Sequence, residues 1–214
     1  PTFTPVAGTY GTSQSVSIST TTSGTTICYS TGAPPACNPA KTGCTTGTKF
    51  TSNVNVAVDT TLQAMACRAG WVDSSSNSAA YVIDTTPPGN VTSFIATAGD
   101  TQVVLTWVKP GDADLAGIKV VRKTGSAPVN ESDGTEVYNG MGTTYTDTSL
   151  INGTTYYYAA FAYDTVANYA SGAQASATPV EPAPTVLATT PANGAMNVLP
   201  CSGTPCIAKI VVQF

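Results

Sequence analysis

Six cysteines are the residues of this chain whose type and spacing most plainly predict chemistry. They stand at positions 28, 37, 44, 67, 201 and 206. A structural zinc site needs Cys-x2-Cys-type pairs combined with further Cys or His ligands. The sequence has no Cys-x2-Cys pair and no His. We therefore expect the cysteines to form disulfides, which persist in an oxidising compartment.

The surroundings of the cysteines predict how they pair. Cys28 lies in the strand-like segment 25–30, and Cys67 ends another such segment, 61–67. The second and third cysteines flank a loop rich in Pro and Gly, and the last two bracket the tight segment 202–205. We therefore expect three disulfides, which join Cys28 to Cys67, Cys37 to Cys44 and Cys201 to Cys206.

Three aspartates form a candidate calcium site. Asp112 and Asp114 lie between two expected strands, and Asp164 follows a later strand. We expect both loops at one end of the same domain, where the carboxylates could bind Ca²⁺ together with backbone carbonyls. Their spacing matches no calcium loop that we can specify, and Asp also caps turns by accepting hydrogen bonds from backbone amides. Turn capping is therefore the competing interpretation.

Catalysis by acidic residues is the next class of chemistry. A glycosidase needs two carboxylates that flank a cleft, one of them with a raised pKa. The acids Asp112, Glu131, Asp133 and Glu136 lie in segments that we expect to be exposed, and a small β-sandwich offers no deep cleft. Without His the chain also lacks a His-based triad or dyad. We expect no enzymatic activity and no cofactor apart from calcium.

Aromatic side chains provide a candidate surface for sugar binding. Flat rings stack on sugar faces, and a rigid ring costs little conformational entropy to hold in place. The candidates are Trp71, Tyr10 and Tyr138. The alternative for each of them is packing in a core or between domains, which is the commoner use of aromatic residues.

The overall composition excludes several classes of partner. Only 9% of the 214 residues are charged, against about 25% in an ordinary soluble domain. Thr and Ser, with 37 and 18 positions, take much of their place. A net charge of −4 without a basic cluster argues against a nucleic-acid partner. No apolar run approaches the ~20 residues of a membrane span, so we expect no membrane insertion in this segment.

The distribution of turn residues predicts an all-β fold. Turn signals recur roughly every 8–12 residues, and no helical periodicity persists. Pro-rich stretches, which favour stiff extended chain, divide the sequence. We expect domains at 1–84 and 85–178, a linker at 179–184 and a third part at 185–214, which is too short to bury a core by itself. Both ends of the chain look like cuts within a longer polypeptide.

Residues 1–84 contain a recognisable series of short segments. They are PTFTPVAGTY (1–10), VSI (16–18), TICYSTG (26–32), TLQAMA (61–66) and AGWVDS (69–74). In this order they resemble the Ig-like module at the C-terminus of chitobiases and β-hexosaminidases, which many bacterial surface proteins repeat. The resemblance implies a β-sandwich. It implies no glycosidase activity, because the catalytic barrel of those enzymes is a separate domain.

Residues 85–178 contain the segments VVLTW (103–107), GIKVVR (117–122), TYTD (144–147) and NGTTYYYAAFAYD (152–164). They resemble the strands of a bacterial fibronectin type III domain, including its corner tyrosine, and the resemblance places Trp107 in the core. The segment PTVLATTPANGAMNV (184–198) resembles the start of a bacterial Ig-like domain. The last segment, 207–214, would then be a strand with an unpaired edge, which invites strand addition by a partner.

These observations predict tandem Ig-like and fibronectin type III β-sandwiches with a partial third β-module. The favoured function is a non-catalytic structural spacer in a large extracellular bacterial surface protein, adhesin or filament. Its partners would be neighbouring modules or copies of the same protein, joined by strand complementation through residues 185–214. The alternative is a carbohydrate-binding accessory region of a secreted polysaccharide-degrading enzyme, with a glycan as the partner.

Overall fold

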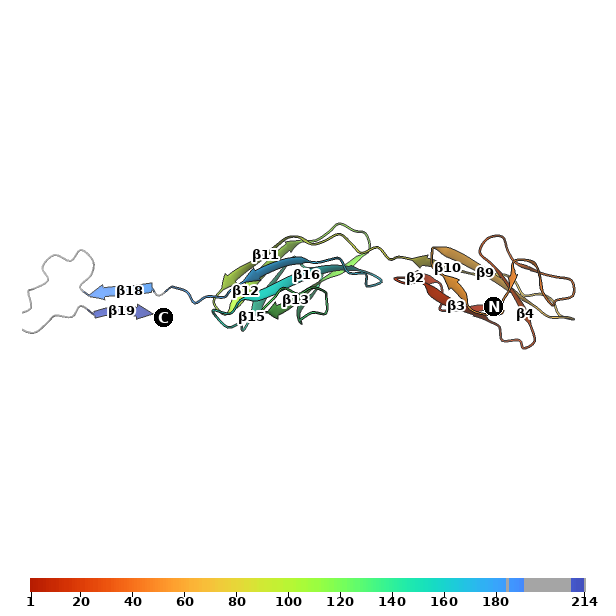
Figure 1. Ribbon diagram of the computed structural model, residues 1–214, viewed down its shortest axis with the longest axis horizontal. Helices are drawn as coiled ribbons and strands as arrows, with labels where there is room; N and C mark the ends of the chain where they lie inside the picture. The colour runs from red at the N-terminus through yellow and green to blue at the C-terminus, as the bar shows by residue number, and fades with distance from the viewer. Residues whose placement is uncertain (184, 191–208, 214) are drawn as a thin grey trace, which may run out of the picture. The chain divides into compact units, whose positions relative to one another are not determined.

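The computed structural model describes residues 1–183, 185–190 and 209–213, the last two segments by their backbone only (Figure 1). Every regular element among these residues is a β-strand, which confirms the predicted all-β class. By their contacts the residues divide into two compact units. One contains 1–89, 110–117 and 162–170, and the other contains the remaining described residues. No helix in the described part of the chain is long and apolar enough to cross a membrane.

Two sheets form the first β-sandwich. The three-stranded sheet has the order β1 (Thr2–Thr4), β3 (Gln14–Ser19), β8 (Val54–Val56). The five-stranded sheet has the order β2 (Gly8–Tyr10), β10 (Asn77–Ile83), β9 (Thr60–Cys67), β4 (Thr26–Ser30), β7 (Thr48–Lys49). A short hairpin of β5 (Ala36–Cys37) and β6 (Cys44–Thr46) follows β4 in the sequence.

The core of this sandwich follows from the alternation of side chains along its strands. Val16 and Ile18 of β3 are buried, and Leu62 and Ala64 of β9 face them from the other sheet. Successive residues of a strand point to opposite faces, so Ser17 and Gln63, which lie between these positions, point away from the core. The hydroxyl of Tyr81, which is buried in the same core, donates a 2.7 Å hydrogen bond to the carbonyl of Pro5.

Two disulfides fasten the β5–β6 hairpin to the five-stranded sheet. They join Cys28 to Cys44, with their Cα atoms 5.7 Å apart, and Cys37 to Cys67, with their Cα atoms 6.4 Å apart. The four cysteines are disulfide-bonded as expected, but the predicted pairs, Cys28 with Cys67 and Cys37 with Cys44, are wrong. The expected Cys201–Cys206 bond lies outside the described residues.

The register of β4 and β9 explains the error. Cys28 lies opposite Met65, and Cys67 lies opposite Thr26. Cys28 and Cys67 are therefore diagonal neighbours, and such pairs lie about 7–8 Å apart, beyond the ~7 Å between Cα atoms that a disulfide can span. Each instead bonds to one cysteine of the hairpin, and the two bonds cross in the sequence.

Two further sheets form a second β-sandwich. The three-stranded sheet has the order β11 (Thr92–Gly99), β12 (Gln102–Val108), β15 (Thr144–Thr148). The four-stranded sheet has the order β14 (Thr135–Gly140), β13 (Leu115–Thr124), β16 (Tyr156–Asp164), β17 (Ala173–Ala177). Trp107 of β12 is buried as expected, and its ring makes edge contacts with Phe94 and Tyr138. The hydroxyl of Tyr156 accepts a hydrogen bond from the amide of Ile151, which is the contact of a corner tyrosine.

A buried polar network joins the two sheets of this sandwich. Asp147 of β15 is 4% exposed and accepts hydrogen bonds from Arg122 of β13 at 2.8 and 2.9 Å. The hydroxyl of Tyr158 of β16, which is fully buried, donates a further bond to Asp147 at 2.9 Å. A buried carboxylate is tolerated only when it is paired and hydrogen-bonded. Both donor side chains, Arg122 and Tyr158, belong to the four-stranded sheet, whereas Asp147 belongs to the three-stranded sheet.

The third part of the chain contributes two strands. Strand β18 (Thr185–Thr190) pairs antiparallel with β19 (Lys209–Gln213), with an irregularity of register between Val186 and Ala188. They form a two-stranded sheet. Such a ribbon is only marginally stable by itself in water. The limits of the predicted domains, at residues 84, 178 and 185, stay predictions.

The Arg122–Asp147–Tyr158 network predicts a loss of stability in alkali. Burial, followed by the hydrogen bond to Asp147, raises the pKa of Tyr158 above its ordinary value of 10.0. The stabilisation by the neutral phenol is therefore complete below about pH 10 and is lost as the pH rises above it. We expect Tyr158→Phe to cost about 1–3 kcal/mol at pH 7. In urea unfolding at pH 8 to 11, the variant should lose less stability than the wild type. If the free energy of unfolding fell equally with pH in the variant and the wild type, this role of Tyr158 would be contradicted.

Candidate functional site

The turn after β9 brings together an exposed indole and a guanidinium. The amide of Trp71 donates a 3.0 Å hydrogen bond to the carbonyl of Arg68. Gly70, the third residue of this turn, has a φ of 80°, a conformation that glycine adopts without strain. The guanidinium carbon of Arg68 consequently lies 5.3 Å from the centre of the Trp71 ring, while Trp71 remains 61% exposed.

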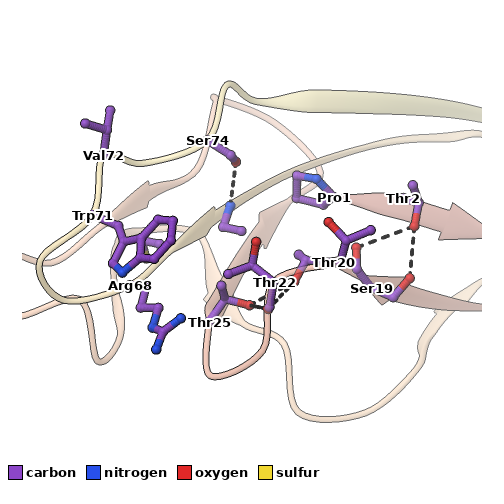
Figure 2. A pocket seen from close by; sticks show the side chains of 13 residues that line it. Pro1, Thr2, Ser19, Thr20, Thr22, Thr25, Arg68, Trp71, Val72 and Ser74 are labelled. Carbon is purple, nitrogen blue, oxygen red and sulfur yellow. Dashed lines mark hydrogen bonds between the residues drawn. The ribbon is translucent and has the colours of Figure 1, made fainter.

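These two residues form one side of a groove of about 260 Å³ (Figure 2). The other walls are the first two residues of the chain and the β3–β4 turn, with Thr20, Thr22 and Thr25. Figure 2 shows Trp71 and Arg68 on one side and these threonines on the other. The groove is therefore built from three segments that are far apart in the sequence.

Both ends of the 68–73 loop are anchored to the β5–β6 hairpin. Cys67, immediately before Arg68, is bonded to Cys37. Asp73, two residues after Trp71, forms a 2.6 Å ion pair with Lys41 of the hairpin turn. The amide of Ala66 also donates to the hydroxyl of Ser74 at 2.9 Å. The disulfide and the ion pair thus position the indole of Trp71, although the large apolar side chains of this loop are exposed.

The structure separates the three aromatic residues that were candidates for sugar binding. Trp71 lines the groove. Tyr10 stacks on Tyr81 at 6.1 Å between ring centres, and its hydroxyl donates to the carbonyl of Val6. Tyr138 lies against Trp107 at 5.2 Å and accepts a hydrogen bond from the amide of Gly142. Tyr10 and Tyr138 thus pack against other aromatic rings, which is the alternative that we considered for each candidate.

Arg68 was missed by the sequence analysis. The signal that could have found it is the tetrapeptide RAGW (68–71), because Gly at the third position of a four-residue turn places the first and last residues side by side. A lone Arg three residues before a Trp has no other feature that marks it.

Three carboxylates gather within the first compact unit. The carboxylate oxygens of Asp84, Asp114 and Asp164 lie within 4.8 Å of one another, which makes this group a candidate cation site. Asp112, which we expected in the site, is replaced by Asp84. One oxygen of Asp112 instead accepts a 3.0 Å hydrogen bond from the amide of Gly89. Asp84 was overlooked because it lies at the end of the first predicted domain, beside a Pro-rich stretch that we interpreted only as a domain boundary.

Asp164 also acts as a turn cap. It is 1% exposed, and one of its oxygens accepts hydrogen bonds at 2.9 Å from the amides of Val166 and Asn168. Its other oxygen accepts from the side-chain amide of Asn168 at 2.7 Å, and the same amide group donates to the carbonyl of Asp84. Asp84 likewise accepts a 3.0 Å hydrogen bond from the amide of Thr86, so the capping interpretation describes both Asp84 and Asp164. Asp84 and Asp114 are the more accessible members of the group.

The acids weighed as catalytic residues lie in separate interactions. Asp133 pairs with Lys123 at 2.8 Å, and Glu136 pairs with Lys119 at 3.3 Å. The hydrogen bond from Lys123 lowers the pKa of Asp133, the opposite of the shift that a general acid requires. Glu131 accepts a 3.1 Å hydrogen bond from the hydroxyl of Ser132.

Comparison with known proteins places the fold in a wide group of modules. No protein-family model matches the chain, and no curated protein matches it. Among solved structures, it is similar to titin domains A168–A170, with a TM-score of 0.55 and 14% identity, over 82% of this chain and 62% of that chain. It is also similar to the FN1–FN3 domains of chicken CNTN1, with a TM-score of 0.52 and 10% identity, over 85% and 68% of the two chains.

A bacterial structure shows the same likeness. The fibronectin(III)-like modules of CbhA from Clostridium thermocellum match with a TM-score of 0.50 and 13% identity, over 84% of this chain and 93% of that chain. At these identities the likeness concerns the fold alone. The two sandwiches therefore have the fold of fibronectin type III-like and Ig-like β-sandwich modules. The chitobiase-type assignment of residues 1–84 stays a prediction.

The carboxylate group predicts a response to calcium. Three carboxylates this close repel one another, and Ca²⁺ bound by their oxygens would relieve the repulsion. We expect millimolar Ca²⁺ to raise the melting temperature by a few degrees, as a ligand that binds only the folded state does. Asp114→Asn should abolish the rise, whereas Asp112→Asn, the matched control outside the group, should keep it. A wild-type melting temperature that neither Ca²⁺ nor a chelator shifts would show that these acids only cap turns.

Proposed function

We propose that this chain is a non-catalytic spacer region of a large extracellular bacterial surface protein, adhesin or filament. The chain contains two β-sandwiches that follow each other in the sequence. Fibronectin type III-like and Ig-like modules of this kind often serve as spacers in extracellular proteins. Disulfides persist in oxidising compartments, which supports an extracellular location. The proposed mechanism is mechanical: the sandwiches keep their length under load while the Pro-rich segments set the spacing between them.

The crossed disulfides are the observation that carries this proposal. A load that unfolds the first sandwich runs along the chain to Cys28, crosses to Cys44, returns to Cys37 and crosses again to Cys67. The segment from Cys28 to Cys67 spans about 39 residues. While both bonds are intact, a load can extend only the roughly seven residues of it between Cys37 and Cys44. Most of the segment between Cys28 and Cys67 is therefore protected from extension even after the strands separate.

The second sandwich is fastened by a different interaction. Residues 85–183 contain no Cys. The Arg122–Asp147–Tyr158 network instead links its two sheets through three side chains, with donor–acceptor distances of 2.8 to 2.9 Å. Removing one partner of a buried charged group typically destabilises a protein by several kcal/mol, so the link resists separation of the sheets.

Force spectroscopy on the full chain tests the mechanical role. The Cys201→Ser/Cys206→Ser variant confines the effect of reductant to the first sandwich. We expect a reductant to lengthen the unfolded first sandwich by about 100 Å, at about 3.4 Å per released residue. The predicted but wrong pairing would give about 130 Å, because Cys28 and Cys67 would be joined directly. The extension of the second sandwich is the internal control and should not change. An unchanged first sandwich would contradict the proposal.

The proposal includes assembly through the third part of the chain. Strands β18 and β19 form a two-stranded sheet, and a sheet of this size becomes stable when further strands are added. A neighbouring copy that donates a strand would provide them through main-chain hydrogen bonds. A head-to-tail exchange of this kind generates a filament.

Sedimentation of two chain lengths tests the assembly. We expect the 214-residue chain to form dimers and larger species as its concentration rises, and a chain of residues 1–183 to remain monomeric. Limited proteolysis of the monomer should remove residues 185–214 first, because an incomplete sheet is exposed. A 214-residue chain that stays monomeric while this segment resists protease would exclude strand exchange.

A further inference from the structure

We propose that the groove beside Trp71 binds an acidic saccharide, with a sugar face on the indole and the sugar carboxylate at the guanidinium of Arg68. This binding site is independent of the spacer role, because it concerns the exposed surface of the first sandwich. Three observations support it: an Arg without an acidic partner, an exposed indole held in place, and free hydroxyl groups on the opposite wall.

Arg68 is a cation without an acidic partner in the described part of the chain. The four ion pairs found there engage Lys41, Lys119, Arg122 and Lys123. Arg68 is the one charged side chain among those lining the groove, and it contacts the Trp71 ring. The nearest acid in the sequence, Asp73, is bound to Lys41 and does not line the groove. Lys49 and Lys109 also have no acidic partner, but their ammonium groups donate to the carbonyls of Thr42 and Met141.

The chemistry of Arg68 selects a carboxylate. A guanidinium is planar and stays charged at every physiological pH, and its N–H groups match the two oxygens of a carboxylate. Stacking on an aromatic ring uses the face of the guanidinium and leaves the N–H groups at its edge available. The ring of Trp71 therefore orients Arg68 without consuming its hydrogen bonds.

The indole provides the surface for the sugar ring. Trp71 is 61% exposed and its neighbour Val72 is 96% exposed, although large apolar side chains are normally buried. The turn at Gly70, the Cys37–Cys67 disulfide and the Lys41–Asp73 ion pair hold the loop in place before a ligand arrives. A site that is ordered in advance loses less entropy on binding.

The opposite wall of the groove carries two kinds of threonine hydroxyl, those that are hydrogen-bonded within the turn and those that are not. The hydroxyls of Thr20 and Thr25 lie 2.9 Å apart, and both donate to the carbonyl of Thr22, so they fix the shape of the β3–β4 turn. The hydroxyls of Thr21 and Thr22 line the groove and have no hydrogen-bond partner among the described residues. They are free to exchange hydrogen bonds with the hydroxyl groups of a sugar.

The combination favours a saccharide over a small free anion. A free anion would use the guanidinium and leave the indole and the hydroxyls without a role. The volume, about 260 Å³, lies just below the range of about 300–1,000 Å³ for drug-sized ligands. It suits one sugar ring of a longer chain whose neighbouring rings extend into solvent.

Calorimetric titration with matched pairs of oligosaccharides tests the proposal. Each acidic probe is compared with its neutral counterpart: trigalacturonate with galactotriose, and sialyllactose with lactose. We expect at least one acidic probe to bind the wild-type chain at least about tenfold more tightly than its counterpart, the amount that one charge-assisted hydrogen bond supplies. We also expect added salt to weaken this binding, because the contact is exposed.

Three variants assign the binding to the groove. Arg68→Gln should weaken binding of the acidic probe about tenfold and leave binding of the neutral probe unchanged. Trp71→Ala should abolish both. Lys49→Gln is the matched control: it removes one positive charge from β7, outside the groove, and should bind as the wild type does. The melting temperature of each variant shows that it is folded.

Three results would overturn the proposal. The first is that no acidic probe binds. The second is equal binding of acidic and neutral probes, which would exclude a carboxylate at Arg68. The third is an Arg68→Gln variant that binds as the Lys49→Gln control does, which would place the site elsewhere. None of these results bears on the force and assembly measurements of the spacer role.

Discussion

The crossed pair of disulfides is the constraint on which the first sandwich depends. A hairpin of two short strands, β5 and β6, has too little buried surface to hold its place by itself, so its position is set by the bonds to Cys28 and Cys67. The hairpin in turn positions the next loop, because Cys37 anchors the residue before Arg68 and Lys41 anchors Asp73. The exposed indole of Trp71 therefore has its place through a covalent bond made some 30 residues earlier in the chain.

The second sandwich solves the same problem with buried polar groups. Its sheets are joined at Asp147. Three hydrogen bonds from Arg122 and Tyr158 compensate the cost of burying the Asp147 carboxylate. A network of this kind is specific, since each group fits only where its partners are present. It also remains intact in a reducing environment, which the disulfides of the first sandwich do not. The two modules thus depend on different conditions for their integrity.

Much of the fold followed from the sequence, because strand periodicity and turn residues are local signals. Trp107 in the core and the corner tyrosine are examples. The disulfide pairing did not follow, because it depends on the register of β4 against β9, and a shift of two residues between strands leaves no trace in composition. The site was half predicted: exposed Trp71 was identified, but Arg68 and Asp84 required knowledge of which loops meet.

The crossed pairing also has a consequence for biosynthesis. A chain that enters an oxidising compartment from its N-terminus presents Cys28 and Cys37 first, and these two are not bonded to each other in the folded protein, although their sulfur atoms lie 3.9 Å apart. Oxidation in order of arrival would therefore join the wrong residues. The native bonds require β9 to pair with β4 before oxidation, or a later thiol exchange that repairs an early error. A secretion host that oxidises this chain before β9 has paired with β4 must therefore supply disulfide isomerisation as well.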